Sequence, residues 1–291
     1  MEIIKSIILG IIEGITEWLP ISSTGHMILT DEILSLKVSD AFKDLFLVVI
    51  QLGAILAVIC LYWNKLWPLH LKKKSVTPYF NSETNGFKRL CNNYVYVDRF
   101  ILWFKILAAS IPAAILGLVF DDQIDAMLTG NSRSYVVATT LIIYGILFIV
   151  IESLKINDKI EDLADLSYTT ALFIGLIQCL ALVPGTSRSG VTILGAIILG
   201  LTRTSAAEFS FYLSIPAMVG GSLIKVLQFL TNGSTFSSEE LIILVVGMIT
   251  AFVVSILAIK FLLSFIKKHD FKAFGYYRII LGIVIFAVLL F

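Results

Sequence analysis

The stretch EGITEWLPISSTGHM, residues 13–27, interrupts an otherwise apolar run that extends from Ile7 to Leu34. It contains two carboxylates, three consecutive hydroxyl side chains and one of the three histidines of the chain. Ionisable groups inside a membrane helix are costly, need partners and usually mark a functional site. A second stretch, PGTSRSG at residues 184–190, interrupts the other half of the chain in the same way. We expect the two stretches to meet in one site.

The composition indicates a membrane protein. Of the 291 residues, 58% are hydrophobic and 15% are charged, whereas a soluble domain has about 25% charged residues. Several apolar stretches are long enough to cross a bilayer as helices. We expect no cleaved signal peptide in the first 20 residues, because the apolar run carries Glu13 and Glu17. The net charge of +1 does not indicate a partner, and no basic block suggests nucleic acid.

Two apolar segments are each broken in the middle, at residues 1–35 and 169–203. Pro20 disfavours helix at Leu19, while Ser22 and Ser23 are good helix N-caps. Each half is too short to cross the hydrocarbon core, so we expect two re-entrant helical hairpins. Six full spans are expected between and after them: Leu45–Tyr62, Phe100–Phe120, Tyr135–Ile151, Ala207–Leu230, Leu241–Ile266 and Phe274–Phe291.

The order of these elements repeats, which predicts two halves at residues 1–155 and 168–291. An offset of 165 residues aligns several polar and glycine positions: Gly10 with Gly175, Glu13 with Gln178, Ser22 with Ser187, Thr24 with Ser189 and Gly25 with Gly190. Three spans per half is an odd number, so the second half enters the membrane with the opposite orientation. The predicted fold is an all-α polytopic membrane protein with six transmembrane helices and two re-entrant hairpins in an inverted-topology repeat.

The distribution of basic residues predicts the orientation, since cytoplasmic loops are rich in Lys and Arg. The polar loop 64–99, the linker 152–168 and the basic turn at 267–272 then lie in the cytoplasm. The loops 121–134 and 231–240 lie outside, as do both termini. The first hairpin enters from outside and the second from the cytoplasm, so their tips meet. Three lysines lie on the wrong side for this rule: Lys5, Lys37 and Lys43.

The two acids of the first stretch, Glu13 and Glu17, lie one helical turn apart on the same face. Such a pair in a medium of low dielectric shares a proton, binds a cation or is neutralised by a base. Oxygen ligands in an open site suit Mg²⁺ or Ca²⁺ held together with a substrate phosphate. The alternative is an exposed pair at a helix end.

The hydroxyl groups of Ser22, Ser23 and Thr24 precede a helix that we expect to begin near Gly25. Capping residues at a helix N-terminus lie beside backbone N–H groups that attract an anion. His26 is three residues after Ser23 and has the chemistry of a base, nucleophile or acid. The alternative is a purely structural histidine.

The second stretch has the features of an anion-binding turn. Its glycines let the backbone approach a ligand, and three hydroxyl groups act as donors: Thr186, Ser187 and Ser189. Arg188 offers paired donors for phosphate oxygens, or alternatively forms an ion pair with Glu13 or Glu17. Arg203 and Glu208, which flank the second hairpin, are expected to pair with each other.

Both stretches resemble the two signature motifs of the bacterial undecaprenyl-diphosphatases of the bacitracin-resistance type. The similarity extends to residues 209–216, FSFYLSIP, and to the charged loop after the first span, so it covers most of the chain. Family members are integral membrane enzymes with re-entrant hairpins in an inverted repeat, and many are homodimers. The resemblance therefore implies the same organisation for this chain.

The resemblance also implies an activity. Family members hydrolyse undecaprenyl diphosphate to undecaprenyl phosphate and phosphate on the outer side of the bacterial cell membrane, which recycles the lipid carrier of cell-wall synthesis and confers bacitracin resistance. The acids that serve metal binding and catalysis correspond to Glu13 and Glu17. The catalytic serine and histidine correspond to Ser23 and His26, and the phosphate-binding arginine corresponds to Arg188.

Two other classes of protein share some of these features. A lipid-phosphate flippase or transporter also uses inverted repeats with broken helices. A phosphatase of the phosphatidic-acid type has a Ser-Gly-His element, but it needs a second histidine after its Ser-Arg element. Here the next histidine after Arg188 is His269, so this class is disfavoured.

Overall fold

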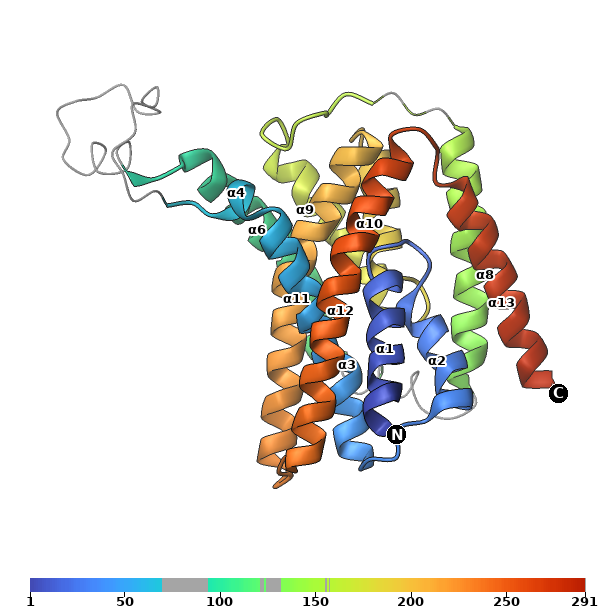
Figure 1. Cartoon of the computed structure of the whole chain (residues 1–291). Helices are drawn as coiled ribbons and strands as arrows, with labels where there is room; N and C mark the ends of the chain where they lie inside the picture. Colours follow the sequence, from blue (N-terminus) through green and yellow to red (C-terminus); the bar gives the residue numbers. More distant parts are fainter. Residues whose placement is uncertain (70–93, 121–122, 124–131, 155, 157, 291) are drawn as a thin grey trace.

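The computed structural model describes residues 1–69, 94–120, 123, 132–154, 156 and 158–290. Within these ranges the secondary structure is helical and contains no β-strand. Six helices are long and apolar enough to cross a membrane (Figure 1). They are α3 (Asp40–Leu61), α6 (Val97–Val119), α8 (Ser132–Ser153), α11 (Arg203–Thr231), α12 (Ser238–Ile266) and α13 (Lys272–Leu290).

The shorter helices form two hairpins. The first consists of α1 (Glu2–Thr16) and α2 (Ser23–Leu34). The second consists of α9 (Tyr168–Gln178), the 3₁₀ turn η1 (Cys179–Leu182) and α10 (Arg188–Ile198). In Figure 1 the turn between α1 and α2 lies about half-way along the long helices, close to α10. A one-turn helix, α4 (Trp63–Leu66), follows α3.

Helices from the two halves of the sequence pack on one another. Hairpin helix α1 packs on α12, and hairpin helix α9 packs on α6. A Cβ on Gly10 would lie 2.7 Å from the carbonyl oxygen of Gly247, and a Cβ on Gly175 would lie 2.0 Å from that of Ala109. Both crossings therefore require glycine, because backbones approach closely only where the side chain is absent. In addition, α3 packs on α11 and α12, and α8 packs on α13.

The six spans predicted from hydropathy are confirmed, with ends that differ from those predicted by a few residues. Most of the polar loop 64–99 lies outside the described residues, and so does the acidic segment after α6. The predicted pair between Arg203 and Glu208 is wrong. Arg203 binds Glu152 at 2.6 Å, and Glu208 binds Lys65 at 2.8 Å. Partners this distant in sequence depend on tertiary packing and leave no local signal.

Candidate active site

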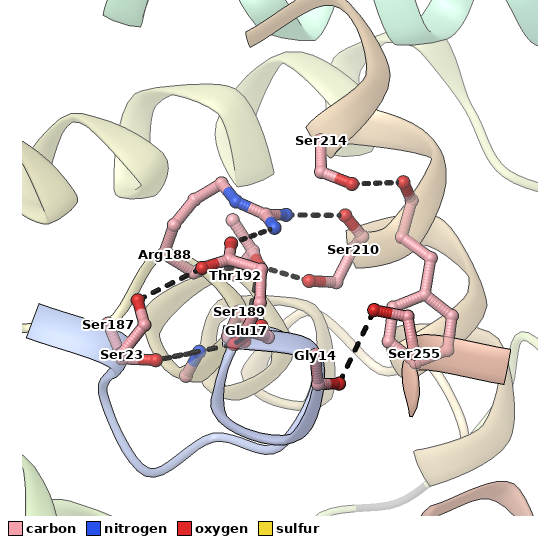
Figure 2. A network of polar contacts seen from close by, with 12 residues as sticks. Gly14, Glu17, Ser23, Ser187, Arg188, Ser189, Thr192, Ser210, Ser214 and Ser255 are labelled. Carbon is pink, nitrogen blue, oxygen red and sulfur yellow. Dashed lines mark hydrogen bonds and ion pairs between the residues drawn. The ribbon is translucent and has the colours of Figure 1, made fainter. Parts of the chain in front are cut away.

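The tips of the two hairpins meet through an ion pair. Arg188, the first residue of α10, donates from Nη2 to Oε1 of Glu17 at 2.8 Å. Its Nη1 donates to the carbonyl oxygen of Ser210 on α11 at 3.0 Å. Figure 2 shows the guanidinium between these two acceptors. The two sequence stretches are thus in direct contact. In this ligand-free structure Arg188 forms the ion pair with Glu17 that was the alternative to phosphate binding.

Further hydrogen bonds converge on Glu17. Ser23 Oγ donates to Glu17 Oε2 at 3.0 Å, and Ser189 Oγ donates to the Glu17 carbonyl oxygen at 3.0 Å. The Glu17 carboxylate therefore accepts from a hydroxyl of its own hairpin and a guanidinium of the opposite hairpin, while the Glu17 carbonyl oxygen accepts from the hydroxyl of Ser189 (Figure 2). Ser23 and Arg188 each begin a helix, so the N-termini of α2 and α10 both lie beside Glu17. Such a place favours an anion.

Two serines hold the backbone of these tips in a strained conformation. Ser22 and Ser187 have φ of 71° and 68°, and they are the only described non-glycine residues with positive φ. Each caps the following helix: Ser22 Oγ accepts from the N–H of Gly25, and Ser187 Oγ accepts from that of Gly190. Strain of this kind costs about 1–3 kcal/mol per residue and is concentrated at functional sites.

His26 is oriented by contacts outside the Glu17 cluster. Nδ1 lies 2.8 Å from the carbonyl oxygen of Ser22, and Nε2 lies 2.7 Å from the hydroxyl of Tyr277 on α13. Because a carbonyl only accepts, Nδ1 carries a proton, and in the neutral ring Nε2 accepts from Tyr277. The sequence spacing placed His26 within reach of Ser23, whereas the hydroxyl of Ser23 is bonded to Glu17.

The remaining predicted site residues lie close to this cluster or within the tips. Glu13, one turn before Glu17, is 1% exposed, and its Oε1 has no hydrogen-bond partner among the described residues. Ser187 and Ser189 have their hydroxyl oxygens 3.3 Å apart. Thr186 is buried in the second tip, and Thr24 is half-buried in the first turn of α2.

A second guanidinium at the hairpin tips, that of Arg278, was not foreseen from the sequence. Arg278 on α13 is 0% exposed and donates to three carbonyl oxygens of the two tips, those of Pro20 at 3.3 Å, Gly185 at 3.0 Å and Thr186 at 2.9 Å. Among the described residues it has no carboxylate partner within salt-bridge distance. Its charge lies inside a predicted span, and such a residue is itself a signal of function. The position of Arg278 within an apolar run is therefore a feature of the sequence that indicates a functional role.

We expect Arg278→Met to lower kcat for phosphate release by roughly a hundredfold, because small displacements of positioned groups have effects of this size. Three carbonyl groups would lose their donor, so the melting temperature should fall as well. Arg278→Lys, which keeps the charge but not the branched donor, should recover part of kcat. Lys272→Met on the same helix, a charge removed near the surface, is the matched control. Unchanged kcat in folded Arg278→Met would contradict the positioning role.

The acids fit a cation that is shared with a ligand. Mg²⁺ and Ca²⁺ take six or more oxygen ligands, and the described residues contain no group of three or more His, Cys, Asp or Glu side chains that could hold a metal. Glu13 offers a buried carboxylate oxygen without a partner, while both oxygens of Glu17 are already bonded. Glu13 and Glu17 could therefore hold a divalent cation only together with phosphate oxygens and water.

The fold and these contacts define a multi-pass helical membrane protein with a polar centre between two hairpin tips. Over residues 6–284 the chain matches the family described as Bacitracin resistance protein BacA. The chain therefore belongs to this family.

Curated relatives agree with the family match over nearly the whole length. The chain is 52% identical over 290 residues to the undecaprenyl-diphosphatase of Enterococcus faecalis, which covers 99% of this chain and 97% of that protein. It is 53% identical over 289 residues to the protein of the same name from Acetivibrio thermocellus, with 98% and 97% covered. It is 52% identical over 285 residues to undecaprenyl-diphosphatase 1 of Clostridium acetobutylicum, with 97% and 95% covered.

Proposed function

We propose that the meeting of the two hairpin tips at Glu17 is the catalytic centre of an undecaprenyl-diphosphatase. The chain hydrolyses undecaprenyl diphosphate to undecaprenyl phosphate and inorganic phosphate, in keeping with its family and the names of its relatives. This reaction recycles the lipid carrier of cell-wall synthesis and is linked to bacitracin resistance. The observation that carries the assignment of the site is the contact of Arg188 and Ser23 with one carboxylate, Glu17.

The substrate phosphates would be held by the second tip. Arg188 presents donors beside the N-terminus of α10, and Ser187 and Ser189 add hydroxyl groups there. The hydroxyl groups of Ser22 and Thr24 and the backbone of Thr186 belong to the same two tips. On phosphate binding, the guanidinium of Arg188 would exchange part of its contact with Glu17 for phosphate oxygens, which suit its planar donors.

Ser23 is the nucleophile in this proposal. Its hydroxyl proton already points to Glu17, so a carboxylate is in place to accept it. Ser23 Oγ would form a bond to the terminal phosphorus while the bond to the bridging oxygen breaks, which releases undecaprenyl phosphate. Water would then hydrolyse the phosphoserine, with His26 as the base that takes a proton from the water. A covalent adduct at Ser23 in rapidly quenched protein, found by mass spectrometry, would support this order.

Charge balance supports a divalent cation as cofactor. Glu17 pairs with Arg188, Glu13 lies one turn away, and Arg278 binds carbonyl oxygens of the two tips, so these four side chains carry no net charge when all are ionised. A diphosphate brings further negative charge into this interior. Glu13 and Glu17 would hold Mg²⁺ or Ca²⁺ there, and the cation would neutralise charge on the phosphate oxygens.

The arrangement of helices supports re-entrant hairpins in an inverted repeat. Under the offset of 165 residues, Ser22 and Ser187 share their unusual backbone conformation and Gly10 and Gly175 share a close helix crossing. Helix α1 of the first half packs on α12 of the second half, and the corresponding helix α9 of the second half packs on α6 of the first half. We further propose that this multi-pass protein lies in the bacterial plasma membrane with the site facing outward. A homodimer is the expected assembly.

The test is phosphate release from a polyprenyl diphosphate by purified protein in detergent, where transport across a membrane is impossible. We expect turnover that is lost with a chelator, restored by Mg²⁺ or Ca²⁺, and lowered at least about a hundredfold by His26→Ala. His269→Ala, which removes a histidine outside the site, should leave turnover unchanged. Absence of phosphate release, with transport of the lipid in vesicles, would instead favour a flippase.

A further inference from the structure

A cavity of about 640 Å³ lies away from the candidate site. It is formed where α4, the first turns of α6 and α11, and the linker residues 161–164 come together. None of the predicted catalytic or phosphate-binding residues lines it. Its volume is in the range of cavities that hold small molecules, and the reaction proposed for the hairpin tips leaves it without a role.

The charges that line this cavity are separated by sign. One wall, from α4 and α6, carries three basic side chains: Lys65, Arg99 and Lys105. The other wall, from the linker and α11, carries three acidic side chains: Glu161, Asp162 and Glu208. Asp98 is the exception, since it lies on the basic wall. A cavity with this separation is complementary to a ligand that carries both charges.

Several of these groups retain capacity for a ligand. Lys65 and Glu208 bind each other at 2.8 Å and connect the two walls. Lys105 is 5% exposed and donates to the carbonyl oxygens of Leu163 and Ala164 at 3.4 and 3.1 Å. The guanidinium of Arg99 donates one N–H to the carbonyl oxygen of Trp67, out of the five that it carries.

The surroundings of the cavity point to a lipid. Trp63 and Trp67 are exposed, stack with ring centroids 4.6 Å apart and flank Lys65 in sequence. Tryptophans of this kind are enriched at the level of lipid headgroups. Only 17% of the apolar segment of helix α6, which supplies part of the basic wall, is buried. Phe100 and Phe104 are exposed on this helix. Acyl chains therefore have an apolar helix surface beside a charged cavity.

We propose that this cavity binds the headgroup of a zwitterionic aminophospholipid of the surrounding bilayer. The phosphate faces Arg99 and Lys105, and the primary ammonium faces Glu161 and Asp162. An ammonium with hydrogens donates to carboxylates, whereas a quaternary ammonium does not, so the acidic wall selects phosphatidylethanolamine over phosphatidylcholine. This binding site is independent of the function proposed for the hairpin tips.

The test is native mass spectrometry of the purified full-length chain, titrated with phosphatidylethanolamine, phosphatidylcholine or phosphatidylglycerol. Exposed charge pairs have modest energies, so we expect phosphatidylethanolamine to bind about three- to fivefold more tightly than phosphatidylcholine. The double variant Glu161→Gln/Asp162→Asn should abolish this preference. Arg99→Gln should weaken both lipids equally, because both carry the phosphate. Glu239→Gln, an exposed acid at the start of α12, is the matched control and should change neither.

Phosphatase activity and melting temperature of each variant show whether it is folded. Both acids of the double variant are exposed, so this variant carries the test even if Arg99→Gln fails to fold. Binding of phosphatidylglycerol that equals or exceeds that of phosphatidylethanolamine would overturn the proposal, and so would a preference for phosphatidylethanolamine that survives in the double variant.

Discussion

Arg188→Met is expected to lower kcat/KM for phosphate release by at least about a thousandfold. Removal of a single preorganised donor to transition-state charge costs about a hundredfold to a thousandfold, and Arg188 supplies more than one donor beside a helix N-terminus. Arg188→Lys keeps the charge but loses the planar pair of donors, so it should recover only part of the loss. The measurement is steady-state kinetics of phosphate release in detergent, with KM and kcat determined separately.

The control for Arg188 is another arginine that is also paired with a carboxylate. Arg203, at the start of α11, donates twice to Oε2 and once to Oε1 of Glu152 on α8. Arg203→Met should lower the melting temperature while leaving kcat and KM of the folded protein unchanged. If Arg188→Met also changed only the melting temperature, then its ion pair with Glu17 would be structural and the phosphate-binding role would be wrong.

Glu17→Gln is the second variant with a large expected effect, again at least about a thousandfold in kcat. The change preserves the shape of the side chain but removes the charge that Arg188 faces and the base that accepts from Ser23. An unpaired buried charge costs about 3–5 kcal/mol, so the melting temperature should fall too.

The double variant Glu17→Gln/Arg188→Met tests whether the two residues act as a unit. Residues that act together show strongly non-additive effects. We therefore expect the double variant to lose no more than about tenfold beyond the worse single variant. Losses in kcat that simply multiply would show that the two side chains act independently. Glu152→Gln is the control for removal of a buried acid.

The spans and the two tips could be predicted from the sequence because their signals are local. Each span is an apolar run, and each tip is a polar interruption of one. The partner of Ser23 could not be predicted in this way, because it depends on the backbone conformation of the turn, in which Ser22 has a positive φ. Glu17, six residues earlier, accepts from it, whereas spacing alone favoured His26.

Other features depend on helices that are distant in the chain. Arg278 reaches both tips from the last span, and the charged cavity draws on four separate segments. Periodicity and hydropathy contain no information about which helices become neighbours. The charge of Arg278 is nevertheless visible in the sequence, and an arginine within an apolar span usually has a functional role.

A series of aromatic side chains lies between the cavity and the hairpin tips, and it bears on how the membrane retains its proton gradient. Tyr212, which lines the cavity, contacts Tyr62 at right angles, Tyr62 contacts Phe211, and Phe211 contacts Trp18 of the first tip. Trp18, Phe211 and Tyr212 are each fully buried. A polar centre inside a membrane that carries a proton gradient would conduct protons if water reached it from both sides. We therefore expect these four contacting rings to keep water and ions from passing between the charged cavity and the polar centre.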